Sequence, residues 1–230
     1  MMSQNTIYTA VGNLQHRTTE NRETYPVIHL RGQDYPVDLQ ELTVWSALCW
    51  RFCDLEQLRG HYEQLKGLRV SERRPLESCL VRLEMRGLVA KGTGSTGFEA
   101  LYDLLSELYV QPVSESFSYR ASAFLSLLWH GVSAGKAMRV FLRDRRNTRE
   151  TQVMVLAKQA LLSSAELVKC VELGVTDVSS DEKLMDALYN DEDTTSDNIG
   201  ALMQAAESRE PVTVAIANLY LRKQIVLERV

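Results

Sequence analysis

Three helical patterns in succession between residues 38 and 87 constrain the fold of this chain more than any other feature. Apolar residues recur at helical spacing over three stretches, residues 39–52, 54–67 and 75–87. Asp38 and Glu41 have the spacing of a capping box at the start of the first stretch. Gly87 is placed to end the third stretch in a left-handed conformation. The pattern therefore predicts three short helices joined by brief connections.

Short strand patterns flank these helices. Residues 25–30 and 35–39 lie on either side of a turn-forming segment and predict a hairpin, with prolines that favour sheet edges. Residues 88–91 predict one more strand, and residues 92–97, with three glycines, predict a flexible hairpin tip. Residues 1–24 are polar and lack an apolar rhythm, so we expect a loosely attached N-terminal arm.

The second half of the chain, residues 98–230, has a different pattern. Leu, Val, Ala and Met recur at helical spacing over seven stretches, residues 98–108, 119–130, 136–142, 148–173, 181–189, 197–208 and 211–228. We therefore expect an all-helical bundle that begins after a boundary near residue 95. The last stretch is apolar on nearly every side, so it is expected in the core or against a second copy. This half is expected to mediate homodimerisation or to enclose an effector.

Composition places the chain among globular proteins, with 45% hydrophobic and 24% charged residues. There is no signal-peptide pattern and no apolar run long enough to cross a bilayer, so a cytoplasmic protein with reduced cysteines is expected. The net charge is −4. Residues 1–95 hold 12 basic and 11 acidic side chains, whereas residues 96–230 hold 14 and 19. The first half is therefore close to neutral, unlike most DNA-binding domains.

The order of strands, three helices and a further strand resembles the winged helix-turn-helix superfamily over about residues 25–97. The stretch Leu68–Val89 is similar to its recognition-helix segment, with Leu76, Leu80 and Leu83 as buried anchors and Gly87 before the wing. The resemblance implies a mostly α fold with a small β-hairpin or wing, a winged helix-turn-helix followed by an all-helical domain. It also implies a DNA-binding transcriptional regulator or accessory factor whose partner is double-stranded DNA.

In that superfamily the third helix usually lies in the major groove. The resemblance therefore implies DNA-binding roles for the outward residues of this segment and of the wing, Arg73, Arg74, Ser78, Arg82, Arg86, Lys91 and Thr93. Glu77 and Glu84 lie on or near the same helix and would repel phosphate. Further along the chain, a basic cluster could contact phosphate beside the wing through Arg143, Arg145 and Arg146, although such a cluster is more often a solvated helix end.

A second family also begins with a strand pair before three helices. It is the peptide-recognition fold of PqqD-like proteins, in which a peptide adds a strand to the hairpin edge and leans on the third helix. The segment from Val27 to Leu48 looks similar. Strand addition needs no basic surface, so the neutral charge fits it. The alternative function is therefore a non-enzymatic adaptor that binds a protein or peptide.

Signals for catalysis, metals and cofactors are weak. Cys49 and Cys53, with His61 downstream, could form a metal or redox site, but two small buried residues on a helix are the favoured interpretation. The acidic run Asp191–Asp197 lacks the glycine and glutamate of a calcium loop. No nucleophile, acid–base or phosphate-loop spacing stands out. We therefore expect no enzyme, no cofactor and no bound metal.

Overall fold

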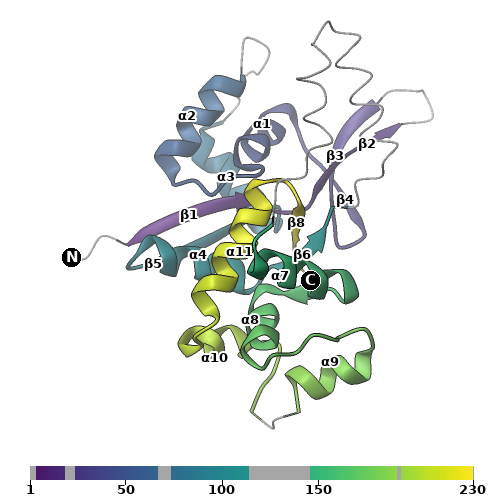
Figure 1. The fold of residues 1–230 in the computed structure, drawn as a ribbon. Helices are drawn as coiled ribbons and strands as arrows, with labels where there is room; N and C mark the ends of the chain where they lie inside the picture. The colour runs from purple at the N-terminus through teal and green to yellow at the C-terminus, as the bar shows by residue number, and fades with distance from the viewer. Residues whose placement is uncertain (1–3, 19–23, 67–73, 114–145, 191–192, 230) are drawn as a thin grey trace, which may run out of the picture.

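The computed structural model describes residues 4–18, 24–66, 74–113, 146–190 and 193–229 (Figure 1). The predicted stretches 119–130 and 136–142 lie outside the described residues. The three predicted helices of the first half are present as α1 (Leu39–Leu48), α2 (Leu55–Lys66) and α3 (Leu76–Met85). In the described residues no helix is long and apolar enough to span a membrane.

The predicted caps of these helices are confirmed. The Asp38 side chain accepts from the Glu41 N–H at 2.8 Å, and the Glu41 side chain accepts from the Asp38 N–H at 3.3 Å. These reciprocal bonds satisfy donors that the first turn of α1 would leave without partners. Gly87 follows α3 with φ of 73°, a left-handed conformation that glycine adopts without strain. The short-range signals therefore specified the start of α1 and the end of α3 correctly, whereas α1 ends at Leu48, before the predicted end at residue 52.

The strands of the described residues form three small antiparallel sheets. In the first sheet, β1 (Asn5–Ala10) pairs with β5 (Val89–Gly94). The second has the order β2 (Asn13–Thr18), β3 (Thr24–Leu30) and β4 (Gln33–Pro36). The third places β6 (Tyr109–Pro112) between β7 (Leu162–Ser163) and β8 (Ile225–Glu228). Residues expected to form a loose arm thus supply β1 and β2.

The glycine-rich segment is not a hairpin tip. Gly92 and Gly94 belong to β5, and the chain passes directly into α4 (Gly97–Ser106), which Thr96 caps. A Cβ on Gly92 would lie 2.2 Å from the Ala100 carbonyl oxygen, and one on Gly94 would lie 2.4 Å from the Ala100 nitrogen. The glycines therefore allow α4 to lie directly on the strand. Among the described residues, the strand partner of β5 is β1 rather than a second wing strand.

The second half contains α7 (Thr148–Gln159), α8 (Ser164–Glu172), α9 (Asp181–Leu188), α10 (Ile199–Leu202), the short 3-10 helix η2 (Met203–Ala205) and α11 (Arg209–Leu221). The stretch 148–173 is two helices, interrupted by β7, and the final helix ends at Leu221 before β8. The predicted fold class, a mostly α winged helix-turn-helix followed by an all-helical domain, is therefore wrong. Strands from both halves form three sheets, and the expected wing is absent from the described residues.

The last helix lies in the core, one of the two places predicted for it. Tyr220 of α11 packs its ring 5.2 Å from the rings of Trp50 and Phe52, measured between centroids. Its hydroxyl donates to the Ala10 carbonyl oxygen at 3.1 Å and accepts from the Trp50 N–H at 3.0 Å. One hydrophobic cluster therefore includes residues from both halves. The boundary near residue 95 and the homodimer stay predictions.

Candidate functional site

The arginines expected to read DNA converge on a buried carboxylate of the protein itself. Glu41 is 2% exposed, and it contacts Arg74 at 3.4 Å, Arg82 at 2.9 Å and Arg86 at 3.2 Å. Arg74 also pairs with Asp38. A buried carboxylate needs such partners because burial in a medium of low dielectric disfavours its charge. These side chains therefore stabilise the packing of α3 against the first turn of α1.

The remaining predicted DNA contacts are scattered. Ser78 is exposed on α3, and Lys91 is exposed on β5. The backbone N–H of Thr93 donates to Asp103 Oδ2 of α4 at 2.8 Å. Arg146 donates to Gln224 Oε1 at 2.5 Å, after the C-terminal end of α11. Arg73, Arg143 and Arg145 lie outside the described residues. DNA binding by this set stays a prediction.

The exposed residues of α3 are two apolar ones, Val81 and Met85, and two polar ones, Ser78 and Arg82. Val81 is 53% exposed and Met85 is 83% exposed, and the two side chains lie four residues apart on one side of the helix. Leu80 and Leu83 are buried in the core, as predicted, whereas the third predicted anchor, Leu76, is only partly buried against it. Glu77, on the flank toward α2, contacts Arg59 Nη2 at 2.5 Å. The face therefore combines two exposed apolar side chains with charged side chains, of which Glu77 and Arg82 are paired within the protein.

The edge strand β4 lies next to the C-terminal end of α3. Arg86 Nη2 donates to the Pro36 carbonyl oxygen at 2.6 Å, and the guanidinium lies 5.9 Å from the centre of the Tyr35 ring. β4 pairs with β3 on one side, and no other strand of the described residues pairs with its other side. Backbone groups of successive residues in an antiparallel strand point to opposite sides of the strand, so residues two apart point to the same side. Asp34, two residues before Pro36, therefore directs its N–H and carbonyl toward the same open edge.

The two cysteines singled out in the sequence are not one turn apart on a helix, because α1 ends at Leu48. Cys53 is buried, and its backbone pairs with that of Tyr8. Burial raises the pKa of the Cys49 thiol to about 11, and the nearby Lys223 and Arg51 only partly oppose this shift. Among the described residues, no group of three His, Cys, Asp or Glu side chains is arranged to hold a metal ion.

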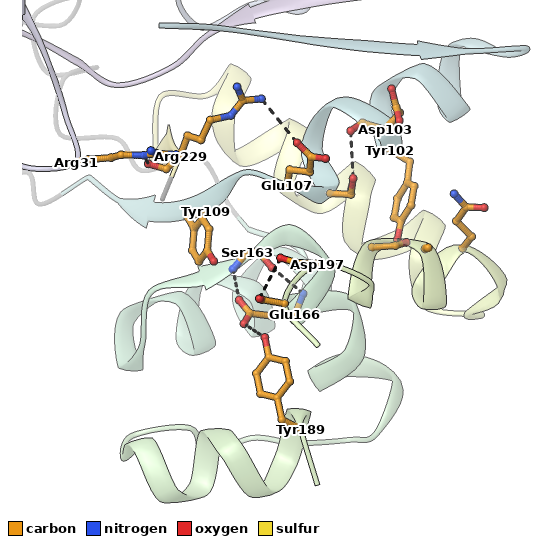
Figure 2. Close-up of a pocket in the computed structure, with 15 residues that line it drawn as sticks. Arg31, Tyr102, Asp103, Glu107, Tyr109, Ser163, Glu166, Tyr189, Asp197 and Arg229 are labelled. Carbon is orange, nitrogen blue, oxygen red and sulfur yellow. Dashed lines mark hydrogen bonds and ion pairs between the residues drawn. The ribbon is translucent and has the colours of Figure 1, made fainter. Parts of the chain in front are cut away.

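Sequence reasoning missed a polar cleft of about 820 Å³ (Figure 2). Its walls come from α4, α8 and α10, with contributions from the β3–β4 turn and from the C-terminal end of the chain. Its lining includes charged and phenolic side chains, those of Arg31, Asp103, Glu107, Tyr109, Glu166, Tyr189, Asp197 and Arg229. These residues come from segments far apart in the sequence, so no single stretch signals the site.

Glu166 lines the cleft. It is buried, and it completes a capping box with Ser163 at the start of α8. Its Oε2 accepts from the Ser163 N–H at 2.6 Å, and its Oε1 accepts from the Tyr189 hydroxyl at 2.5 Å. Burial raises the pKa of Tyr189, and the bond to Glu166 raises it further, so the phenol stays a donor. The Ser163-x-x-Glu166 spacing is the signal that could have revealed this helix start.

Two arginines lie on another side of the cleft. Arg31, in the β3–β4 turn, has φ of 54° and donates from Nε to the Arg229 carbonyl oxygen at 2.5 Å. Arg229 Nη2 lies 3.8 Å from Glu107 Oε2. Figure 2 shows this group apart from Asp197, Glu166 and Tyr189. Burial raises the pKa of Tyr109, with a further contribution from the charge of Glu166. The arginines thus share their side of the cleft with Glu107, and Glu166 and Asp197 lie apart from them.

Comparison with protein-family models, with curated proteins and with solved structures finds no match for this chain.

Proposed function

We propose that this protein is a non-enzymatic adaptor that binds an extended segment of a partner polypeptide along β4 and against α3. The observation that carries the proposal is the composition of α3. Its arginines are engaged by Glu41, whereas Val81 and Met85 face outward. Such a face suits contact with apolar side chains of another protein. Reading base edges requires polar side chains that are free to reach them.

The edge of β4 supports strand addition. An added strand would form main-chain hydrogen bonds with the outward N–H and carbonyl of Asp34 and with the carbonyl of Pro36. Arg86 donates to that Pro36 carbonyl in the free protein. The guanidinium thus occupies the position that a partner N–H would take, and it keeps the edge satisfied until a partner binds.

Charge also favours a polypeptide over DNA. The three arginines are offset by Asp38 and Glu41, which leaves an excess of one positive charge among these five groups. Tight DNA binding draws on the neutralisation of several phosphates. The β3–β4 hairpin is followed by α1, α2 and α3, which is also the order of elements in the PqqD-like peptide-recognition fold. In that fold a peptide adds a strand to the hairpin edge and leans on the third helix, and the corresponding surface of this protein is the one proposed to bind a peptide.

The test selects binders from a library of random linear peptides displayed on phage, with the full chain as bait. Affinity of the selected peptides is then measured by fluorescence anisotropy. Val81→Asp and Met85→Asp should each weaken binding about tenfold or more, because a charge replaces an apolar contact. The matched control is Val155→Asp on α7, a comparably exposed valine that should leave affinity unchanged.

Hydrogen exchange tests the strand addition separately. Bound peptide should slow exchange of the Asp34 amide, because that N–H becomes hydrogen-bonded. Failure to select any peptide, or peptides that bind the α3 variants as tightly as the parent chain, would overturn the proposal. Binding to random-sequence duplex DNA that weakens steeply with salt and is lost in Arg82→Ala would support the DNA-binding regulator instead.

A further inference from the structure

We infer that the outer edge of β2 is a self-association surface, on which two copies of this chain pair their β2 strands antiparallel about a two-fold axis. β2 pairs with β3, and no other strand of the described residues pairs with its outer side (Figure 1). This edge lies at the opposite end of the β2-β3-β4 sheet from β4, so it is separate from the β4–α3 surface. Pairing of two copies would join their sheets into one continuous sheet.

The strand register shows which backbone groups of β2 point outward. Arg86 reaches the Pro36 carbonyl, which points away from β3, so Val27 opposite Pro36 directs its own groups toward β2. Val27 lies opposite Gln15, and Gln15 therefore directs its N–H and carbonyl toward β3. Successive residues point to opposite sides, so the residues of β2 that point to the open edge are Leu14, His16 and Thr18.

The backbone groups on this edge form no hydrogen bond with another described residue. Three other strands carry such contacts. Cys53 bridges β1, and Arg86 covers the edge of β4. The N–H of Gly12 donates to the Leu227 carbonyl of β8 at 2.9 Å. Proteins block exposed edges with lysine, proline or a bulge, because free N–H and carbonyl groups pair with other strands. β2 has none of these devices over its six residues.

The sequence of β2 matches itself when it runs antiparallel to a second copy. Outward residues must lie opposite outward residues if they are to exchange hydrogen bonds. In the register centred on His16, this residue faces its own copy, and Leu14 faces Thr18 of the second copy. A shift by two residues leaves one outward residue of each strand without a partner. The centred register therefore forms the most main-chain hydrogen bonds.

The charges of β2 allow this pairing. Arg17 carries the one permanent charge of the strand, and it donates to Asp34 at 2.5 Å and 3.1 Å. In the centred register Arg17 lies opposite Gln15 of the second copy, whose amide oxygen accepts hydrogen bonds from a guanidinium group. Opposite residues thus bring no permanent like charges together. A second copy of this chain matches the edge in both hydrogen bonding and charge.

Sedimentation velocity of the full chain tests the association. With rising concentration the mass should change from that of one chain to that of two, with a dissociation constant of about 100 μM or lower. His16→Pro removes the outward N–H at the centre of the edge and spares the pairing with β3, so it should weaken association about tenfold or more. His16→Thr keeps this N–H and is the matched control, with unchanged association. Thermal unfolding verifies that both variants fold.

A cysteine crosslink tests the register without a proline. His16→Cys places two thiols opposite each other, with Cα atoms about 5.5 Å apart, which a disulfide can span. Thr18→Cys places the thiols four residues out of register, with Cα atoms about 13 Å apart, which is too far. Oxidation with copper phenanthroline should therefore crosslink only His16→Cys above the background that the native cysteines give in the parent chain.

Three results would overturn the inference. One is the mass of a single chain at every concentration, which would leave the edge to a strand of another protein. Another is a dimer that folded His16→Pro leaves as stable as in the parent chain. The third is equal crosslinking of His16→Cys and Thr18→Cys.

Discussion

Arg82 Nε donates to Glu41 Oε1 across 2.9 Å, and this bond joins the exposed side of α3 to the buried first turn of α1. Arg74 and Arg86 contact the same carboxylate, so one buried acid holds three arginines of the segment expected to read DNA. A residue predicted to cap a helix therefore also determines what α3 presents to solvent. The cap and the surface cannot be altered independently.

Glu41→Gln should destabilise the protein by about 1–3 kcal/mol, because the three guanidinium groups lose their shared anion. The estimate stays below that for a fully buried pair because Arg82 is 57% exposed and water screens it. Urea unfolding followed by circular dichroism measures the loss. Glu63→Gln, which removes only an exposed pair with Lys66 on α2, should change stability by less than about 1 kcal/mol. Equal effects of the two substitutions would contradict the stabilising role assigned to the contacts of Glu41 with the three arginines.

Gly92→Ala should destabilise the protein by about 3 kcal/mol or prevent folding, because the new methyl group would overlap α4. Its Cβ would lie 2.2 Å from the Ala100 carbonyl oxygen and 2.4 Å from Leu104 Cβ. Gly60→Ala in α2 is the opposite case, since nothing lies within 4 Å of its new Cβ. That change should stabilise by up to about 1 kcal/mol through helix propensity. Thermal unfolding of both variants tests the sign of each effect.

The glycine-rich segment, residues 92–97, was predicted as a hairpin tip, but Gly92 and Gly94 belong to β5. The difference shows which features local sequence signals can specify and which they cannot. Local signals located α1, α2, α3 and their caps, because a capping box and a left-handed glycine depend on neighbouring residues alone. The role of Gly92 depends on Ala100 and on β1, the strand that pairs with β5, so its pattern is equally typical of a flexible turn. The packing of α4 on β5 and the pairing of β5 with β1 make this segment a strand rather than a flexible turn.

The strands of the second half were missed for a related reason. β7 has two residues, and β8 continues the apolar pattern of α11, so neither produces an alternation of its own. Both pair with β6, which lies far from them in sequence. The polar cleft depends on the same distant pairings, since Glu166 follows β7 and Arg229 follows β8. The Ser163-x-x-Glu166 capping box was the one local signal that could have divided the long helix.

Tyr220→Phe should cost about 1–3 kcal/mol, because the Trp50 N–H and the Ala10 carbonyl would lose their partner in a buried site. The ring packing is retained, so the effect isolates the hydroxyl. Denaturant unfolding should show a lower midpoint with an unchanged slope. Tyr25→Phe, at an exposed position in β3, is the control and should be nearly neutral. A neutral Tyr220→Phe would contradict the hydrogen bonds assigned to this hydroxyl.

Cys49 should react slowly with thiol reagents. Burial raises its pKa to about 11 from an ordinary value of 9.0. Its thiolate fraction near neutral pH should therefore be about a hundredfold lower than that of an unperturbed cysteine. Alkylation by iodoacetamide, followed by mass spectrometry of the folded protein, measures the rate against that of glutathione. A rate equal to that of glutathione would contradict the buried environment of the Cys49 thiol, and it would favour a redox role for this residue.

Asp34 links stability to acidic pH. Hydrogen bonds from Arg17 and then His29 lower its pKa to about 2 from an ordinary 3.8. A carboxyl group whose pKa is lower in the folded state stabilises that state above its unfolded pKa, and the contribution is lost as pH falls toward the folded value. Asp34→Asn should therefore lower the melting temperature near neutral pH, and the difference from the parent chain should vanish near about pH 2. Asp186→Asn, an exposed change on α9, controls for loss of a surface charge. A deficit in Asp34→Asn that persists near pH 2 would mean that the side chain acts through packing rather than through its charge, and it would contradict the pH dependence assigned to Asp34.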